Sequence, residues 1–509
     1  MDEEKYRTLC NACDEILSDL GGSAAILAIS YLHIIREHPG FLEKYENLFD
    51  PELPAQAPRS ALKNLAGLAR VLFHAGPCQV ERDSPRRADV LFVSHLVNAA
   101  QLTDPEDFYF YDLPQQCEGQ GISCAVALID HVREPFVGFR NGFLRGGVRT
   151  TLLRSHLGMS AALRDIVHLK AARAQIRLAA KKESRTLNRH VLDSAALACV
   201  TPETLWNLGL GAQIAKLANK LRPRFLVMTY EGHAWEKVAC RMARIANPKL
   251  KCIGYQHSSL FRMQHAIRRN LGRGCDPDII MTAGSMAKNI LDLEPRLQRT
   301  PVRVLGSRRG RGQSPTPDMG GSSQKVAEFR SGCLVIPEGT EPECRMLFEF
   351  SLRCAAILPG VNFIWRVHPV ISGSGFLTRD RLFHNLPKNV TLSRLSLEED
   401  IVSCQAVLYR GSTAVVKAAA AGLVPIYVGR AQEMSIDPLF TLGGYRMIAC
   451  SPPEVAEALD RPHLTQEKTS RYCDAELQEI LGTFYEPLRP EALISFFQEG
   501  CGAAGHRGS

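Results

Sequence analysis

The sequence predicts an α/β protein in which two parallel-sheet domains face a cleft and a helical region is added at the N-terminus. Short apolar segments that end in polar clusters alternate with helical segments, both before and after a stretch rich in Gly, Ser, Pro and Arg. In addition, the 509 residues are too many for one hydrophobic core. These two observations together favour a two-domain protein with a sheet in each half.

The composition is that of an ordinary folded protein, with 45% hydrophobic and 22% charged residues. The net charge of +8 fits a mixed solvated surface, and it also fits phosphate-bearing ligands or an anionic membrane. Apart from Cys10 and Cys13 the 16 cysteines are scattered singly, as expected for reduced thiols in a cytosolic protein. We see no signal peptide and no apolar run long enough to span a bilayer, so a membrane contact would be peripheral, at the inner face.

The chain begins with a helical region, residues 1–84, in which apolar residues recur at helical spacing. The first sheet domain is expected over residues 85–305, and its first strand over 88–94, just before His95. Asp107 lies in the polar loop that follows. Because ligands bind outside the carboxyl ends of parallel strands, His95 and Asp107 are candidates for residues that face the cleft.

Residues 145–220 are predicted to form a helical insertion in this domain, and the part from 170 to 189 is strongly basic. A solvated helix face is the simplest interpretation, and an anionic membrane surface is the alternative. Nucleic acid is not an expected partner, because the stretch lacks interleaved aromatic residues and no nucleic-acid-binding motif accompanies it.

Two further strands of the first domain end in polar clusters, which is typical of the ligand-binding edge of a parallel sheet. Glu231 and His233 follow the strand 225–229, and the next strand ends at Gln256 and His257. Glu231 is the candidate catalytic base, since a carboxylate at a strand end can take a proton from an acceptor. His233, Gln256 and His257 are candidates for contacts in the cleft.

A linker is expected over residues 306–325, where no apolar periodicity remains. The second sheet domain then covers residues 326–509 and includes a helical tail that can pack back across the domain boundary. Its strand ends are expected to bind a nucleotide and its phosphates. The candidate residues are Glu338, Gly339, Arg366, His368, Pro369, Arg410, Gly411, Ser412 and Thr413.

Local features support this phosphate site. Ser412 and Thr413 precede an Ala-rich segment and are expected to open a helix whose N–H groups bind an anion. Pro369 fixes the turn after His368. No metal site is predicted, since the Asp276–Pro–Asp278 pair precedes its strand and is interpreted as a turn. A P-loop motif is also missing from the sequence.

With Tyr230-Glu231-Gly232, His368-Pro369 and Ser412-Thr413 in these places, the sequence resembles GT-B glycosyltransferases of bacterial surface-carbohydrate biosynthesis, in particular the sialyltransferase and Kdo-transferase group. The resemblance covers about residues 85 to 460 through short motifs. It implies two Rossmann-like domains and a metal-independent, inverting transfer that needs no cofactor besides the nucleotide-sugar co-substrate. It also implies that Glu231 is the base and that the other two motifs hold the nucleotide, usually CMP, and its phosphate.

The donor and the acceptor stay open. The leading interpretation is transfer of a CMP-activated acidic sugar, such as Kdo or a sialic-acid-like nonulosonic acid, to a surface glycan of lipopolysaccharide or capsule, or to its lipid-linked precursor. Related enzymes use UDP-, GDP- or CDP-linked donors. One alternative is a CDP-glycerol-type phosphotransferase or a nucleotide-sugar epimerase on the same fold. The other is a non-catalytic assembly partner.

Overall fold

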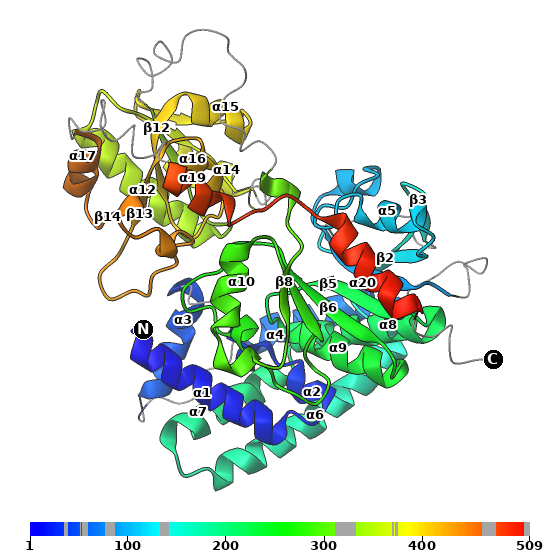
Figure 1. The fold of residues 1–509 in the computed structure, drawn as a ribbon. Coiled ribbons are helices and arrows are strands. Elements are labelled where there is room, and N and C mark those ends of the chain that lie inside the picture. Colours follow the sequence, from blue (N-terminus) through cyan, green and yellow to red (C-terminus); the bar gives the residue numbers. More distant parts are fainter. Residues whose placement is uncertain are drawn as a thin grey trace.

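The computed structural model of the chain describes residues 1–34, 39–50, 52, 60–76, 87–132, 142–310, 332–368, 371, 375–460 and 475–502. Two β-sheets, each with helices on its faces, are accompanied by a helical lobe beside the first sheet (Figure 1). The predicted fold class is therefore confirmed. No helix among the described residues is long and apolar enough to cross a membrane.

The first sheet has the strand order β3-β4-β2-β1-β5-β6-β7-β8, and among the described strands β3 alone runs antiparallel to its neighbour. The apolar runs fit this arrangement, because parallel strands are covered by helices on both faces and every residue of β5 is buried. The strands are β1 (Val90–Leu96), β2 (Cys124–Asp130), β3 (Phe143–Arg145), β4 (Val148–Leu153), β5 (Phe225–Thr229), β6 (Lys251–Gln256), β7 (Ile279–Thr282) and β8 (Val302–Val304).

Strands β3 and β4 correct the prediction that residues 145–220 are helical throughout. β4 pairs with β2 in parallel and with β3 in antiparallel register. Gly146 and Gly147 connect β3 to β4 with φ of +54° and +81°, which glycine adopts without strain. The helical insertion itself begins at Met159.

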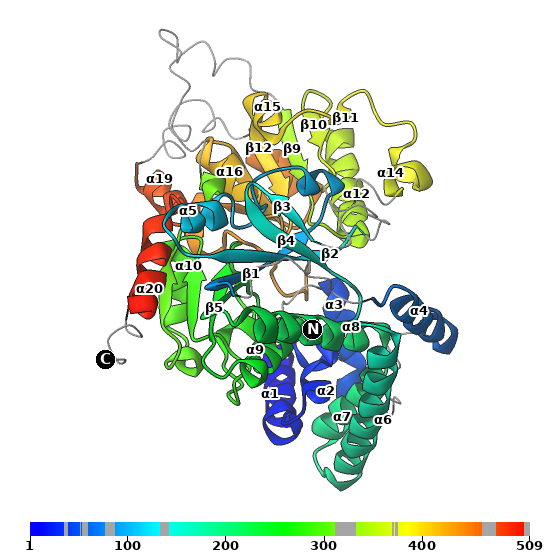
Figure 2. The same cartoon turned by 90° about the vertical axis from the view of Figure 1, so that its right-hand side faces the viewer.

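The helical lobe combines the two helical regions that the sequence predicts separately (Figure 2). One hydrophobic core runs through it and includes Leu9, Ile16, Leu169, Ile176 and Val191. The N-terminal region therefore packs on the insertion. Its helices are α1 (Glu3–Leu20), α2 (Ala24–Leu27), α3 (Pro39–Glu46) and α4 (Ala61–Phe73), and the insertion supplies α6 (Met159–Lys182), α7 (Thr186–Cys199) and α8 (Pro202–Leu221).

Helices cover both faces of the first sheet. On one face, α8 and α9 (Ala234–Ala246) pack against β1 and β5. On the other face lie α5 (Leu113–Gly119) and α20 (Pro490–Gly502), whose Phe497 ring is 4.8 Å from that of Phe225 on β5. The C-terminal helical tail thus packs back across the domain boundary onto the first domain. Helix α10 (Ser285–Asp292) follows β7.

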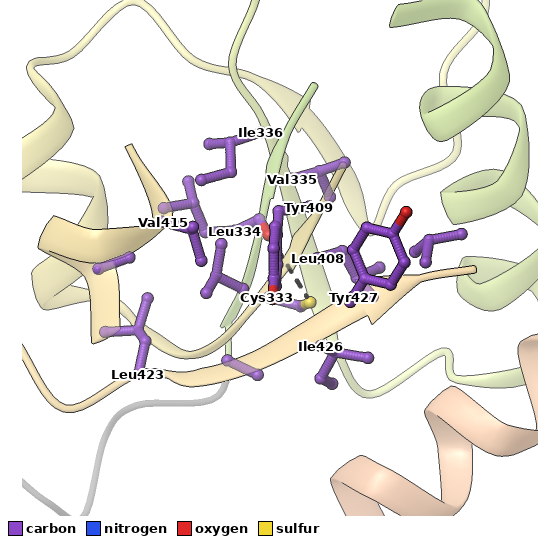
Figure 3. Close-up of a cluster of buried hydrophobic side chains, with 14 of the residues drawn as sticks. Cys333, Leu334, Val335, Ile336, Leu408, Tyr409, Val415, Leu423, Ile426 and Tyr427 are labelled. Carbon is purple, nitrogen blue, oxygen red and sulfur yellow. Dashed lines mark hydrogen bonds between the residues drawn. The ribbon is translucent and has the colours of Figure 1, made fainter. Parts of the chain in front are cut away.

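The second sheet is parallel throughout its described strands, in the order β11-β10-β9-β12-β13-β14. Apolar side chains of its central strands fill the core, with Leu334, Leu408 and Ile426 among them (Figure 3). The strands are β9 (Gly332–Ile336), β10 (Asn362–Trp365), β11 (Val390–Leu392), β12 (Cys404–Tyr409), β13 (Val424–Val428) and β14 (Met447–Ala449). The accompanying helices are α12 (Glu341–Ile357), α14 (Phe376–Arg379), α15 (Leu397–Val402), α16 (Val415–Ala420), α17 (Pro452–Asp460) and α19 (Ala475–Gly482).

The two sheet domains touch through the segments that follow β6 and β7. Phe261 and Ala283 of the first domain join the hydrophobic core of the second. The hydroxyl of Ser259 lies 3.2 Å from that of Tyr485. Of the predicted linker, residues 311–325 lie outside the described residues, and Arg308 just before them pairs with Glu106 at 2.9 Å. The cysteines that the structure describes form no disulfides, and all but Cys450 are buried.

Candidate functional site

The turn after β5 carries the predicted base. Glu231 accepts a hydrogen bond from the Ser258 hydroxyl at 2.9 Å through Oε1. Its other carboxylate oxygen, Oε2, lies 3.3 Å from Nε2 of His233. The ends of β5 and β6 thus bring a carboxylate, a hydroxyl and an imidazole together at the carboxyl-end edge of the first sheet, as the sequence predicts for Glu231 and His233.

Glu236 on α9 holds this turn in shape. Its buried carboxylate accepts the backbone N–H groups of Gly232 at 2.7 Å, His233 at 2.8 Å and Glu231 at 3.1 Å. Burial raises the pKa of Glu236 to about 7, although the nearby His233 lowers it. Gly232 has a φ of +88°, and a Cβ there would lie 2.4 Å from the backbone of Ala266, so a side chain does not fit.

A cluster of aromatic side chains adjoins the Glu231 turn. Nδ1 of His95 lies 2.9 Å from Nε2 of His131, and Nε2 of His95 lies 2.8 Å from the hydroxyl of Thr229. Burial lowers the pKa of His95 well below its usual value, and the neighbouring His131 lowers it further. His95 is therefore neutral at neutral pH. Beside it, the ring of Tyr109 stands edge-on to that of His257 at 4.5 Å.

Two residues predicted to face the cleft are instead buried in supporting contacts. The Asp107 carboxylate accepts the backbone N–H of Tyr109 at 2.9 Å and pairs with Arg145 at 2.8 Å. Asp107 therefore holds the loop that carries Tyr109. Gln256 lies within β6, is fully buried, and donates its side-chain amide to the carbonyl of Ser258. Both side chains are thus held by partners within the protein, Asp107 by the distant Arg145 and Gln256 by the nearby Ser258, and strand-end position alone does not reveal such partners.

The second sheet brings the ends of β9, β10 and β12 together. A Cβ on Gly339 would lie 2.9 Å from Nδ1 of His368, so the imidazole packs directly on this glycine. Gly411 has a φ of +65°, and a Cβ there would lie 2.6 Å from Oε2 of Glu338. Four of the predicted nucleotide-binding residues are thus neighbours. Pro369 lies outside the described residues.

Arg410 differs from its predicted role. Its guanidinium is buried and pairs with Glu343 and with Glu433, each at 2.9 Å. The remaining nitrogen donates to the carbonyl of Val428 at 2.9 Å. Since all three nitrogens are engaged, these contacts do not support direct binding of a phosphate by Arg410, and they assign it to the support of the turn that follows β12.

The structure also differs from the prediction at Ser412, Thr413 and Arg366, the other expected phosphate contacts. Helix α16 begins at Val415, three residues later than expected, and it has only six residues. Ser412 and Thr413 instead form the turn before it, where the Val415 N–H donates to the Ser412 carbonyl at 3.3 Å. Arg366 donates to the Leu395 carbonyl at 2.7 Å and also pairs with an aspartate on α15. A phosphate would therefore meet a turn here and not a long helix.

Metal ligation finds no support in the described part of the chain, where no group of three or more His, Cys, Asp or Glu side chains could hold an ion. Asp276 pairs with Lys237 at 2.7 Å, and Asp278 pairs with Arg244 at 2.7 Å. Both carboxylates of the Asp276–Pro–Asp278 pair are thus engaged in ion pairs within the protein.

Sequence reasoning missed several members of the site. His131 follows the end of β2 and obeys the same strand-end rule that selected His95. Ser258 and Glu236 gave a weaker signal, because a serine in a loop and a glutamate in the first turn of a helix are ordinary capping residues. Only the fold shows that both of them contact the Glu231 turn.

Neither a scan of known protein families nor a search of curated proteins finds a match to this sequence. The structure is similar to solved structures at low identity. With α,α-trehalose 6-phosphate synthase from Burkholderia multivorans the TM-score is 0.46 at 12% identity, covering 83% of this chain and 99% of that one. The glycosyltransferase SnogD from Streptomyces nogalater gives 0.44 at 13%, covering 80% and 100%. Staphylococcus aureus MnaA with UDP gives 0.43 at 9%, covering 82% and 98%.

Proposed function

We propose that the protein is a GT-B-type glycosyltransferase that moves a sugar from a nucleotide-sugar donor to a surface glycan or its lipid-linked precursor. The observation that carries the proposal is the contact of Glu231 with Ser258 and His233 at the carboxyl-end edge of the first sheet. A carboxylate in this position, in a protein with a second parallel sheet whose strand ends also converge, suits a reaction between two bound substrates.

The chemistry follows from the residues at each edge. The Glu231 carboxylate takes the proton of an acceptor hydroxyl, and the oxygen attacks the anomeric carbon of the donor sugar. The bond from that carbon to the nucleotide phosphate breaks, and a single displacement inverts the configuration. The turn around Gly339, His368 and Ser412 receives the leaving phosphate, whose charge is stabilised by the imidazole and by backbone N–H groups. The proposal involves neither a metal nor a resident cofactor.

A CMP-activated acidic sugar is the donor we propose, on the strength of the three motifs around Glu231, His368 and Ser412. The first experiment measures thermal unfolding with CMP, UDP, GDP and CDP. Stabilisation by CMP alone is the expected result. Stabilisation by another nucleotide would replace the donor, and stabilisation by none of the four would favour the non-catalytic alternative and overturn the proposal.

Two variants separate chemistry from binding. In Glu231→Gln we expect loss of sugar transfer with nearly unchanged nucleotide affinity, because the amide cannot accept the acceptor's proton. In His368→Ala we expect nucleotide binding weaker by about 1–3 kcal/mol, the scale of a hydrogen bond to a charged group. His384→Ala, an exposed histidine of the same domain, is the matched control. Wild-type turnover in Glu231→Gln would remove Glu231 from the mechanism.

A further inference from the structure

Helix α4 turns an apolar face outward. Leu62 is 78% exposed, Phe73 is 86% exposed, and Leu65 between them is also exposed. At 100° per residue these three side chains lie within about 80° of one another on one face. Val71 points the opposite way and is buried in the core of the helical lobe. A helix on the surface of a globular protein normally buries its apolar face, so the outward stripe is unusual.

A second apolar stripe lies on the neighbouring helix α6. Met159, Leu163 and Val167 recur every four residues, and each is at least half exposed. Helix α4 packs against α6 and α8, and the N–H of Gly76, just after α4, donates to the carbonyl of His156, just before α6, at 3.0 Å. The two helices that carry the stripes are therefore neighbours in the helical lobe (Figure 2). We call these stripes together the α4–α6 face.

Positive charge accompanies this face. Lys63 and Arg70 border the stripe on α4, since both lie about 80–100° round the helix from Leu62. The solvent-exposed side of α6 carries Arg164, Lys170, Arg177, Lys181 and Lys182. None of these five forms an ion pair with another described residue. The acid on this helix, Asp165, lies 3.0 Å from His156 and is thus already engaged.

Exposed apolar side chains next to exposed Lys and Arg side chains match the chemistry of an anionic bilayer. The apolar side chains enter the boundary between headgroups and acyl chains, while Lys and Arg stay at the level of the lipid phosphates. From these exposed side chains and cations, we propose that the α4–α6 face docks the protein on an anionic membrane surface. The proposal is independent of the proposed sugar transfer, because it rests on the surface of the helical lobe and not on the strand-end residues.

Binding of the full chain to lipid vesicles tests this proposal. The wild-type protein is expected to sediment with vesicles that contain phosphatidylglycerol, less with pure phosphatidylcholine, and less again at high salt, which screens the charges. Leu62→Ser, Leu65→Ser and Phe73→Ser combined are expected to weaken binding by about tenfold or more. These side chains are exposed, so the fold is expected to be preserved, as checked by circular dichroism. Leu293→Ser is the matched control, since Leu293 is 83% exposed at the end of α10.

A second variant tests the charges. Neutralising Lys170, Arg177, Lys181 and Lys182 with glutamine is expected to weaken binding to phosphatidylglycerol vesicles by about tenfold or more and to leave binding to pure phosphatidylcholine unchanged. The proposal would be overturned if the wild-type protein does not bind anionic vesicles. It would also be overturned if the triple serine variant of α4 binds them as tightly as the wild type does. Self-association that the α4 variant abolishes, without vesicle binding, would show instead that a second copy covers this face. Nucleotide stabilisation is measured on the same samples, so that failure of this proposal is distinguished from failure of the catalytic one.

Discussion

The buried carboxylate of Glu236 offers a test of how the Glu231 turn is held in shape. It accepts the backbone N–H groups of Gly232 at 2.7 Å and of His233 at 2.8 Å, and burial raises its pKa from 4.5 to about 7. The variant Glu236→Gln keeps the shape of the side chain and an oxygen that can accept both N–H groups. It differs from the wild type in that it cannot ionise.

The direction in which stability changes with pH follows from the pKa values of Glu236 in the unfolded and the folded protein. The folded protein binds this proton more tightly than the unfolded chain does, so the resulting stability is fully present below about pH 4.5 and is lost as the pH rises through about 7. The difference between 4.5 and about 7 corresponds to about 3 kcal/mol in the free energy of unfolding. Glu236→Gln does not ionise and has no such loss. Its free energy of unfolding, relative to that of the wild type, should therefore rise by about 3 kcal/mol between pH 4.5 and about pH 7.

Denaturant unfolding at a series of pH values measures this change. Tryptophan fluorescence is a suitable signal, because Trp235 lies next to Glu236 at the start of α9. Glu349→Gln, an exposed glutamate on α12, is the matched control and should keep a constant difference from the wild type. If the difference between Glu236→Gln and the wild type is constant from about pH 4.5 to about pH 7, or moves the other way, the burial argument is refuted.

Three further variants test other contacts. Gly339→Ala adds a Cβ 2.9 Å from Nδ1 of His368 and should displace that ring. In titration calorimetry we expect weaker nucleotide binding, as for His368→Ala. Unchanged affinity would show that the ring does not hold the nucleotide. Lys237→Met leaves the Asp276 carboxylate unpaired and should cost about 3–5 kcal/mol in denaturant unfolding, much of it recovered when Asp276→Asn is added. No recovery would mean that the pair is not the source of the loss. Gly232→Ala forces a side chain against Ala266 and should lower both the thermal midpoint and turnover, whereas wild-type values would contradict the close approach.

Local pattern was sufficient for the strands that are apolar along their whole length. β5 has the bounds that the sequence predicts, residues 225–229, and each of its residues is buried. The β3–β4 hairpin was missed because β4 is not a continuous apolar run, and its pairing with β2 is a long-range contact that no local pattern shows. The sequence allows the helical tail to pack back across the domain boundary, but the place where α20 packs depends on long-range contacts such as that of Phe497 with Phe225.

The candidate site also contains residues that local sequence predicts and residues whose surroundings depend on distant partners. The strand-end rule found Glu231, His233 and His368, whose positions follow from parallel strands having their carboxyl ends at one edge. It also selected Asp107 and Arg410, which are strand-end or loop residues with equally polar side chains. What separates these two from the others is a buried partner of opposite charge, and that partner is distant in the sequence.

Charge pairing therefore distinguishes residues that support the site from residues that can meet a ligand. The Arg410 guanidinium is buried between Glu343 and Glu433, and removing one member of such a set leaves a buried charge uncompensated at a cost of about 3–5 kcal/mol. A substrate phosphate would have to displace one of these carboxylates, so it gains little by binding there. Glu231 contacts the Ser258 hydroxyl and the partly exposed His233, and the hydroxyl can turn to an incoming acceptor without leaving a buried charge unpaired. The same reasoning predicts that substitution of Arg410 reduces stability first, while substitution of Glu231 reduces turnover first.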